Sequence, residues 1–323
     1  MRSFERSVFV AAVIACWSTC WSTGASAQQK VQGYNADRLT LSAPGAGWFV
    51  MDSLDTRDGL GGVMALTTGY AHAPLVVRAT DGSQRLPVVD DQAIANFAFA
   101  GTYRRFRLYL DIRMPLVTSG QGGTIGGTKI VAPNVTVPGN PDSLGDARIG
   151  FDARILGNPR DAFRLGAGAQ LFIPNGLRSD YLTDGTYRAM FRALFAGDVS
   201  CLTYAGHLGV HVRPLDDPSA PWTPHGSEFI FGVAAGPRVL VGSGLHHALV
   251  VGPEIYGATA VSSFFSGPST ALEALVSTRL EGVGEGPQLR LKVGAGAGIN
   301  PYFGEPEWRV VFGVEVFDQS ASR

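Results

Sequence analysis

Residues 145–174 read GDARIGFDARILGNPRDAFRLGAGAQLFIP and form two runs that alternate between apolar and polar residues around a turn at 157–160. A period of two places successive side chains on opposite faces of a β-strand. Each run has about a dozen residues, which exceeds an average strand and is close to the roughly 9–11 that a tilted strand needs to cross a bilayer. The stretch therefore predicts a transmembrane β-hairpin with its apolar face toward lipid and its polar face toward a lumen. In the first run Ile149, Phe151, Ala153 and Ile155 oppose Arg148, Gly150, Asp152 and Arg154.

The register of this hairpin follows from the cost of a one-residue slip, which would exchange the two faces. Arg148, Arg154 and Arg164 would then face lipid, at roughly 2–4 kcal/mol for each Arg near the midplane. A soluble β-sandwich with one solvated face would show the same alternation. The hairpin alone therefore leaves both fold classes open, and the rest of the chain decides between them.

The composition excludes several classes of protein. The chain of 323 residues has a formal net charge of −1, so no long-range field attracts nucleic acid or acidic partners. Charged residues make up 16% of the chain, against about 25% in ordinary soluble domains. After the N-terminus no run of about 18 apolar residues encodes a transmembrane helix. This composition favours a β-barrel with a lipid-facing band, although a secreted all-β protein would be similar.

The N-terminus, residues 1–27, is predicted to be a signal peptide. Arg2 and Arg6 precede an apolar core at 8–15, and Ala25-Ser26-Ala27 fits a cleavage site. An alternative cut at a lipoprotein-like box would leave a lipid on Cys16. Cleavage after Ala27 removes Cys16 and Cys20, so Cys201 is the one cysteine of the mature chain, and we expect neither an internal disulfide nor a Cys-based metal site.

Residues 28–59 form a lead segment without sustained alternation. A loop signature at 42–47 precedes the apolar trio Trp48-Phe49-Val50 and the acidic residues Asp52, Asp55 and Asp58. We expect this segment to lie in the periplasm or to enter the lumen. A loose tail held by one aromatic cluster is the preferred interpretation, and a plug is the alternative.

Twelve alternating segments follow and predict an all-β fold: a closed antiparallel transmembrane β-barrel with up-and-down topology over residues 60–317, followed by a periplasmic tail at 318–323. Short connections alternate with long ones, as periplasmic turns and outer loops do in outer-membrane barrels. Both ends of the chain are then expected on the periplasmic side. The predicted strands are 60–79, 86–101, 103–116, 145–156, 161–174, 186–197, 199–213, 226–240, 246–259, 268–281, 287–299 and 305–317.

The polar parity of these strands predicts the residues that line the lumen. Basic residues outnumber acidic ones on this face. Arg148, Asp152, Arg154 and Arg164 lie on adjacent strands and are expected to form a paired network. Gly236-Pro237 and Gly252-Pro253 interrupt two strands, and we expect a bulge or a strand end there. The predicted lumen-lining residues are Arg105, Arg107, Asp111, Arg113, Arg148, Asp152, Arg154, Arg164, Arg188, Arg192, His207, His211, Glu254, Arg290, Lys292 and Arg309.

Several segments carry a family resemblance: GYAHAPL at 69–75, LGDARIG at 144–150, TDG at 183–185, VGPEIYG at 251–257 and the closing aromatic strand. Their order resembles the barrel region of OmpA-like outer-membrane proteins of proteobacteria and covers most of the mature chain. The resemblance implies the outer membrane of a Gram-negative bacterium, with lipid and the barrel assembly machinery as partners. Family members often carry a peptidoglycan-binding domain after the barrel, which this sequence lacks. Phe317 resembles the closing aromatic residue that the machinery recognises, although it falls on the charged parity.

No motif for catalysis, cofactor binding or metal binding occurs, so we predict no enzyme, no cofactor and no metal site. His207 and His211 share the inward face, which leaves an outer-membrane lipase or protease as an alternative. The predicted role is structural or porin-like. The lumen is either closed by Arg–carboxylate pairs or open as a narrow pore for small anions. A soluble secreted β-sandwich that binds a partner is the other alternative.

Overall fold

The structure of the chain is a computed structural model. It describes residues 33–56, 59–79, 85–125, 128–136, 143–215, 226–242, 247–283, 286–300 and 304–319, which all belong to one compact unit. The predicted signal peptide, the Cys16 lipid site and the end of the predicted tail lie outside the described residues.

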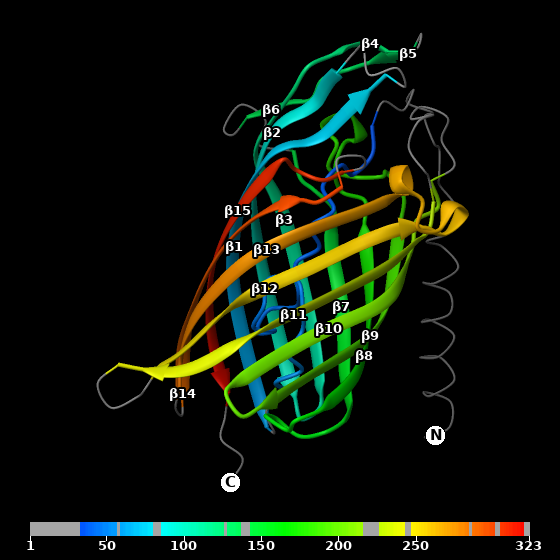
Figure 1. Cartoon of the computed structure of the whole chain (residues 1–323). Coiled ribbons are helices and arrows are strands. Elements are labelled where there is room, and N and C mark those ends of the chain that lie inside the picture. The colour runs from blue at the N-terminus through cyan, green and yellow to red at the C-terminus, as the bar shows by residue number, and fades with distance from the viewer. Residues whose placement is uncertain are drawn as a thin grey trace, which may run out of the picture. The chain divides into compact units, whose positions relative to one another are not determined.

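Twelve long strands form a closed antiparallel barrel (Figure 1). Each strand pairs with its neighbour in the chain, β1 pairs with β15, and β2 pairs with β3, so the sheet closes on itself without a free margin. The barrel confirms the predicted fold and rules out the sandwich, and each predicted segment overlaps one strand. The strands are β1 (Leu60–Arg78), β2 (Arg85–Tyr103), β3 (Phe106–Ser119), β7 (Ala147–Leu156), β8 (Arg164–Ile173), β9 (Arg188–Val199), β10 (Leu202–Val212), β11 (Glu228–Val241), β12 (His247–Ala260), β13 (Thr270–Gly282), β14 (Gly286–Gly298) and β15 (Trp308–Gln319).

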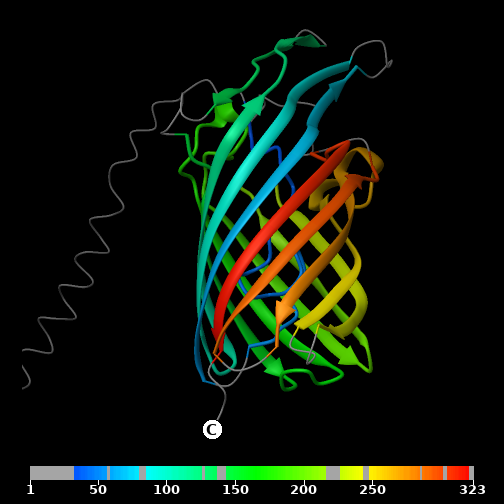
Figure 2. The same ribbon diagram turned by 90° about the vertical axis from the view of Figure 1, so that its left-hand side faces the viewer.

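The long connections gather at one end of the barrel and the tight turns at the other. Strands β1, β2 and β3 rise beyond the rest at the long-loop end (Figure 2). Within the described ranges, no helix has the length and apolarity that crossing a membrane requires. The connections contain the short strands β4 (Gly123–Ile125), β5 (Thr128–Ile130) and β6 (Asn134–Thr136) and the 3₁₀ helices η1 (Arg178–Asp180), η2 (Val261–Ser263) and η3 (Gly267–Ser269).

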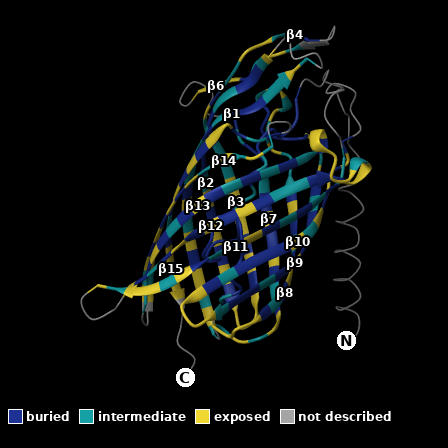
Figure 3. Cartoon of the chain, in the orientation of Figure 1, coloured by how far each residue is buried: buried dark blue, intermediate teal, exposed yellow. Residues whose placement is uncertain are grey.

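The outer wall of the barrel is apolar. Exposed and buried residues alternate along the strands (Figure 3). Large exposed apolar surfaces of this extent mark contact with a membrane or another protein. The exposed side chains include Met64, Phe97, Phe99, Leu108, Phe151, Leu171, Phe191, Val210, Val233, Val276, Leu289, Val293, Val310 and Phe312.

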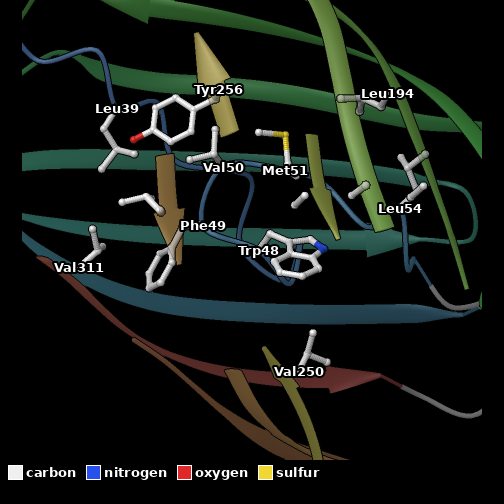
Figure 4. Packing of buried hydrophobic residues seen from close by; sticks show 14 residues of the cluster. Leu39, Trp48, Phe49, Val50, Met51, Leu54, Leu194, Val250, Tyr256 and Val311 are labelled. Atoms are coloured by element: carbon white, nitrogen blue, oxygen red, sulfur yellow. The ribbon is translucent and has the colours of Figure 1, made fainter. Parts of the chain in front are cut away.

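The lead segment, described from residue 33 to residue 56, lies inside the barrel. Trp48, Phe49, Met51 and Leu54 are each at most 2% exposed and pack against wall residues of several strands (Figure 4). Residues 33–56 thus lie in the lumen, where the plug alternative places them, and do not form the loose tail of the preferred interpretation. The physical reason is space, because a barrel wider than about eight strands is not filled by wall side chains alone.

The lead segment runs along the barrel from the long-loop end to the short-turn end. The N–H of Asn35 donates to Asp184 on the β8–β9 connection at 2.9 Å, whereas the carbonyl oxygen of Leu54 lies 3.5 Å from Nη1 of Arg154 near the β7–β8 turn. The described chain thus begins at the end opposite to the end of β15. The segment therefore threads the lumen before β1 begins, and the two termini, to which the prediction of a common periplasmic side applies, lie outside the described residues.

The two Gly-Pro dipeptides cause neither a bulge nor a strand end, contrary to expectation. Strands β11 and β12 keep the same register on both sides of residues 235–237 and 251–253, where the ladder pairing is interrupted. The backbones of β11 and β12 approach each other closely at Gly236 and Gly252, which leaves no room for a Cβ at either position. A Cβ on Gly236 would lie 2.1 Å from the carbonyl oxygen of Val251, and the missing N–H groups of the two prolines fall in the stretch where the ladder pairing is interrupted.

Phe317 faces the interior, which explains why it falls on the charged parity. Its side chain is 4% exposed and packs against Val63 and Tyr109. The guanidinium carbon of Arg290 lies 4.7 Å from its ring centroid, a cation–π contact.

Candidate functional site

The barrel wall carries a dense set of buried charges around the lead segment. The structure places all the predicted lumen residues on the inward side except Arg105. This residue is exposed in the turn between β2 and β3 and donates to the carbonyl oxygen of Ile155 at 3.0 Å. The expectation for Arg105 is corrected because the turn lies at 104–105, later than the pattern predicted. Arg113 is half-buried, and the buried residues are Arg107, Asp111, Arg148, Asp152, Arg154, Arg164, Arg188, Arg192, His207, His211, Glu254, Arg290, Lys292 and Arg309.

The wall charges form ion pairs between strands. The N–O distances are 3.0 Å for Arg148 and Asp111, 2.6 Å for Arg188 and Asp146, and 3.2 Å for Arg192 and Asp152. At the short-turn end Glu315 accepts from both Arg290 and Lys292 at 2.6 Å. Because a buried charge is tolerated only with partners, these pairs explain how so many ions fit in one lumen.

Arg148, Asp152 and Arg164 form ion pairs with residues outside the expected network of Arg148, Asp152, Arg154 and Arg164, and Asp152 pairs with Arg107 and Arg192. In the β7–β8 ladder Arg148 lies opposite Phe172, and Asp152 and Arg154 lie opposite glycines, so these positions provide no partner. Arg164 instead pairs with Asp198 at 2.7 Å, and Arg154 reaches the carbonyl oxygen of Leu54. The partners come from strands and segments that alternation cannot place beside them.

Glu254 holds the backbone of the lead segment. This side chain is completely buried, and its two carboxylate oxygens accept the N–H groups of Phe49 at 3.0 Å and Val50 at 2.8 Å. Both N–H groups belong to a segment without a β-ladder, so a wall side chain satisfies them. Hydrogen bonds to an ionised acceptor are roughly twice as strong as neutral ones. We call this contact the Glu254 latch.

Two acids of the lead segment neutralise arginines of the wall. Asp52 pairs with Arg107, and Asp37 pairs with Arg113 and with Arg309, the latter at 2.7 Å. Burial raises the pKa of Asp37, but Arg309 and Arg113 outweigh burial and lower this pKa to about 2. Sequence reasoning missed the roles of Asp37 and Asp52. The excess of inward basic residues over acidic ones was the signal, because the missing anions had to come from outside the strands.

Wall cations also contact carbonyl groups of the lead segment. Arg148 donates to the carbonyl oxygen of Leu41, and Arg178 donates to that of Gly33 at 2.7 Å. Nζ of Lys292 lies 3.5 Å from the carbonyl oxygen of Trp48. The segment is therefore held along its length through side chains of β7, β14 and the β8–β9 connection.

A cavity of about 100 Å³ lies in the half of the barrel nearer the long loops, beside residues 35–41. One side of its wall, which we call the His pocket, consists of Phe172, Met190, Arg192, His207, His211 and Ile230. Nδ1 of His207 and Nε2 of His211 are buried and have no hydrogen-bond partner among the residues that the structure describes. On the other side neither amide atom of Gln92 is hydrogen-bonded, although this residue is only 1% exposed. The cavity thus offers several polar groups that a solute or water can satisfy.

The His pocket has no arrangement typical of a catalytic site. Nδ1 of His211 lies 3.6 Å from Glu228, which is also paired with Arg213 at 2.8 Å. His207 makes no hydrogen bond with another described residue, so it has no nucleophile to activate. In the part of the chain that the structure describes, no group of three His, Cys, Asp or Glu residues is placed to hold a metal ion.

Two carboxyl groups at the long-loop end differ in charge state. Burial raises the pKa of Glu305 to about 8, with the N–H of Asn300 lowering it and Glu273 raising it further. Burial also raises the pKa of Asp184, but Arg213 and Arg188 outweigh this effect and hold it well below its ordinary value. Asp184 thus stays ionised at the long-loop end of the barrel, whereas burial favours the protonated form of Glu305.

No protein-family model and no curated protein matches the sequence. Solved structures do match, and their low sequence identity makes this a comparison of folds. An outer-membrane channel from Pseudomonas putida F1 aligns with a TM-score of 0.50 and 10% identity over 86% of this chain and 99% of that chain. The NanC porin aligns with a TM-score of 0.44 and 7% identity over 78% and 98% of the two chains. The CymD monoaromatic hydrocarbon channel aligns with a TM-score of 0.43 and 8% identity over 88% and 99%. The first of these matches shows that the barrel has the fold of an outer-membrane channel.

Proposed function

We propose that the chain is an integral outer-membrane β-barrel protein with a porin-like role, and that its own lead segment closes the lumen. The apolar outer wall and the closed barrel support insertion in a bilayer, because a closed barrel leaves no unpaired strand edge in lipid. The long loops then face outward and the tight turns face the periplasm. Lipid of the outer membrane and the barrel assembly machinery are the proposed partners.

A relationship to OmpA-like proteins is part of this proposal and rests on the motif residues alone. Among these motifs, VGPEIYG at 251–257 has the clearest structural role. It contains Gly252, where strands β11 and β12 approach closely, and Glu254, which forms the latch. Export through a cleaved signal peptide is likewise proposed from the sequence of residues 1–27.

The packing of the lead segment is the observation that carries the closed lumen. Trp48 and Phe49 lie in the middle of the barrel interior, and the Glu254 latch holds the backbone next to them. Beyond this point the cavity has only about 100 Å³. A solute therefore needs a displacement of the lead segment to pass.

The pairing of the wall charges argues against a pore that selects anions. Arg148, Arg188 and Arg309 each have a carboxylate partner within 3.0 Å, and Asp37 and Asp52 add negative charge from the lead segment. An anion would meet arginines whose charge is already compensated. Of the two expectations for the lumen, we propose the closed one: the lead segment fills the lumen, and its carboxylates take part in the pairing of the wall arginines.

We propose no catalytic role, because His207 has no nucleophile beside it. Hydrolysis of outer-membrane phospholipid and of a casein-type peptide substrate by the refolded protein tests this point. If activity is present and disappears on replacing both His207 and His211 by Phe, the non-enzymatic proposal fails.

Planar-bilayer conductance of the refolded protein tests the closed channel. Unaltered protein is expected to show long closed periods, and Glu254→Gln is expected to conduct more often because the latch is weakened. The matched control is Val251→Ala, an outward-facing change on the same strand β12. Steady conductance by the unaltered protein contradicts closure by the lead segment. Silence from both proteins contradicts the porin-like role and leaves a structural one.

A further inference from the structure

The His pocket combines an apolar surface with unpaired polar atoms. Phe172, Met190 and Ile230 form a buried apolar cluster, and the ring of Phe172 lies 5.2 Å from that of His211. His207 and His211 are 6% and 5% exposed, and each has a ring nitrogen without a partner. Burying a polar atom without a partner costs free energy, so the pocket favours an occupant that supplies hydrogen bonds.

The charges around the pocket are already compensated. Arg188 pairs with Asp146, Arg192 pairs with Asp152, and Glu228 contacts Arg213. A charged occupant would lose its hydration without gaining an uncompensated partner, which is costly in a buried site. An uncharged imidazole offers one donor and one acceptor, and a hydroxyl group can satisfy either kind of atom.

We propose that the His pocket binds a small uncharged solute that carries a hydroxyl group. The hydroxyl contacts His207 or His211, and the apolar part packs on Phe172, Met190 and Ile230. The cavity volume of about 100 Å³ is enough for about three water molecules, or for a small alcohol with about three to five non-hydrogen atoms. This inference adds a ligand class to the porin-like role and rests on that role only for the route by which the solute enters.

Three probes of similar size separate the possible occupants: isobutanol, isobutyrate and isobutylammonium. The refolded mature protein in detergent, with ¹⁵N-labelled histidine, is titrated with each probe. The ring resonances are followed by NMR and are assigned with His207→Phe and His211→Phe. Isobutanol is expected to shift the resonances of both pocket rings and to bind at least tenfold more tightly than either charged probe.

Replacement of one ring tests the contact directly. His207→Phe keeps an aromatic ring, removes the hydrogen-bonding atoms and is expected to weaken isobutanol binding roughly fivefold. The matched control His247→Phe changes an exposed residue at the start of β12 and is expected to leave binding unchanged. If His207→Phe does not refold, the three-probe series on the unaltered protein decides, followed through the His211 resonance that His211→Phe assigns.

Two results overturn the inference. Tighter binding of isobutyrate identifies an anion site, and unshifted pocket rings at saturating isobutanol show that the cavity holds water only. Because the titration requires no conductance, its failure is distinguishable from a failure of the channel role.

Discussion

The sharpest prediction concerns the Glu254 latch. Glu254→Gln keeps the size of the side chain but leaves one carbonyl oxygen for the N–H groups of Phe49 and Val50, which now lie 3.0 and 2.8 Å from two carboxylate oxygens. One bond loses its acceptor and the other loses its charge assistance. A hydrogen bond to a charged group contributes about 1.5–3 kcal/mol, so we expect the closed position of residues 46–54 to lose about 2–3 kcal/mol.

Hydrogen exchange measures this loss directly, because both N–H groups exchange only when the latch opens. Since about 1.4 kcal/mol is a factor of ten, exchange in peptides covering residues 46–54 is expected to accelerate about 30- to 150-fold. Peptides from β7 and β8 are expected to keep their rates, and Val251→Ala is expected to change neither set. Unchanged exchange at 46–54 refutes the latch. Equal acceleration in every strand shows general destabilisation instead.

The other predictions concern packing, charge and pH. Gly236→Ala places a Cβ 2.1 Å from the carbonyl oxygen of Val251 and is expected to destabilise the barrel by about 1–3 kcal/mol. Gly62→Ala, which has open space at its Cβ, is expected to leave the stability unchanged. The temperature at which the folded gel band disappears measures both variants, and equal temperatures contradict the close approach. Arg107→Met leaves Asp52 buried without its ion-pair partner and is expected to lower the free energy of unfolding in urea by about 3–5 kcal/mol. Arg105 is exposed, so Arg105→Met is expected to change this free energy by no more than about 0.5 kcal/mol. Similar losses in the two variants contradict the placement of Arg105. The pKa of Asp37 is lowered from an ordinary 3.8 to about 2, so its carboxylate stabilises the lead segment by roughly 2 kcal/mol above about pH 4, and this is lost as pH falls toward 2. Protection of residues 35–41, obtained by correcting exchange for the intrinsic rate at each pH, is expected to fall over this pH window in the unaltered protein and to be flat in Asp37→Asn; a flat profile in both argues against the Asp37 pairs.

The strands were predictable because lipid imposes a simple rule on them. In the hairpin of β7 and β8, Phe151 and Leu171 are exposed while Asp152 and Arg164 are buried, as alternation predicts. A slip of one residue would place charges in lipid, so the register follows from residue order alone. The same rule assigned inward positions to residues as distant as Arg107 and Arg309.

The partners of the inward residues were not predictable in this way. Arg148 pairs with Asp111 on the neighbouring strand β3, and Glu254 pairs with backbone groups about 200 positions earlier in the chain. Alternation assigns each side chain to one face of its strand. It does not show which segment or side chain lies next to that residue inside the lumen. The excess of basic residues did require additional anions, but it did not identify Asp37 and Asp52 as their source.

Period-two patterning, strand length and the spacing of turns were thus sufficient to predict a closed barrel and its two faces, because each strand must satisfy the same lipid boundary independently. The path of residues 33–56, the Glu254 latch and the cavity beside His207 emerged only in three dimensions. They depend on closure of the sheet, which creates an interior that distant segments must fill and whose buried charges must find partners there.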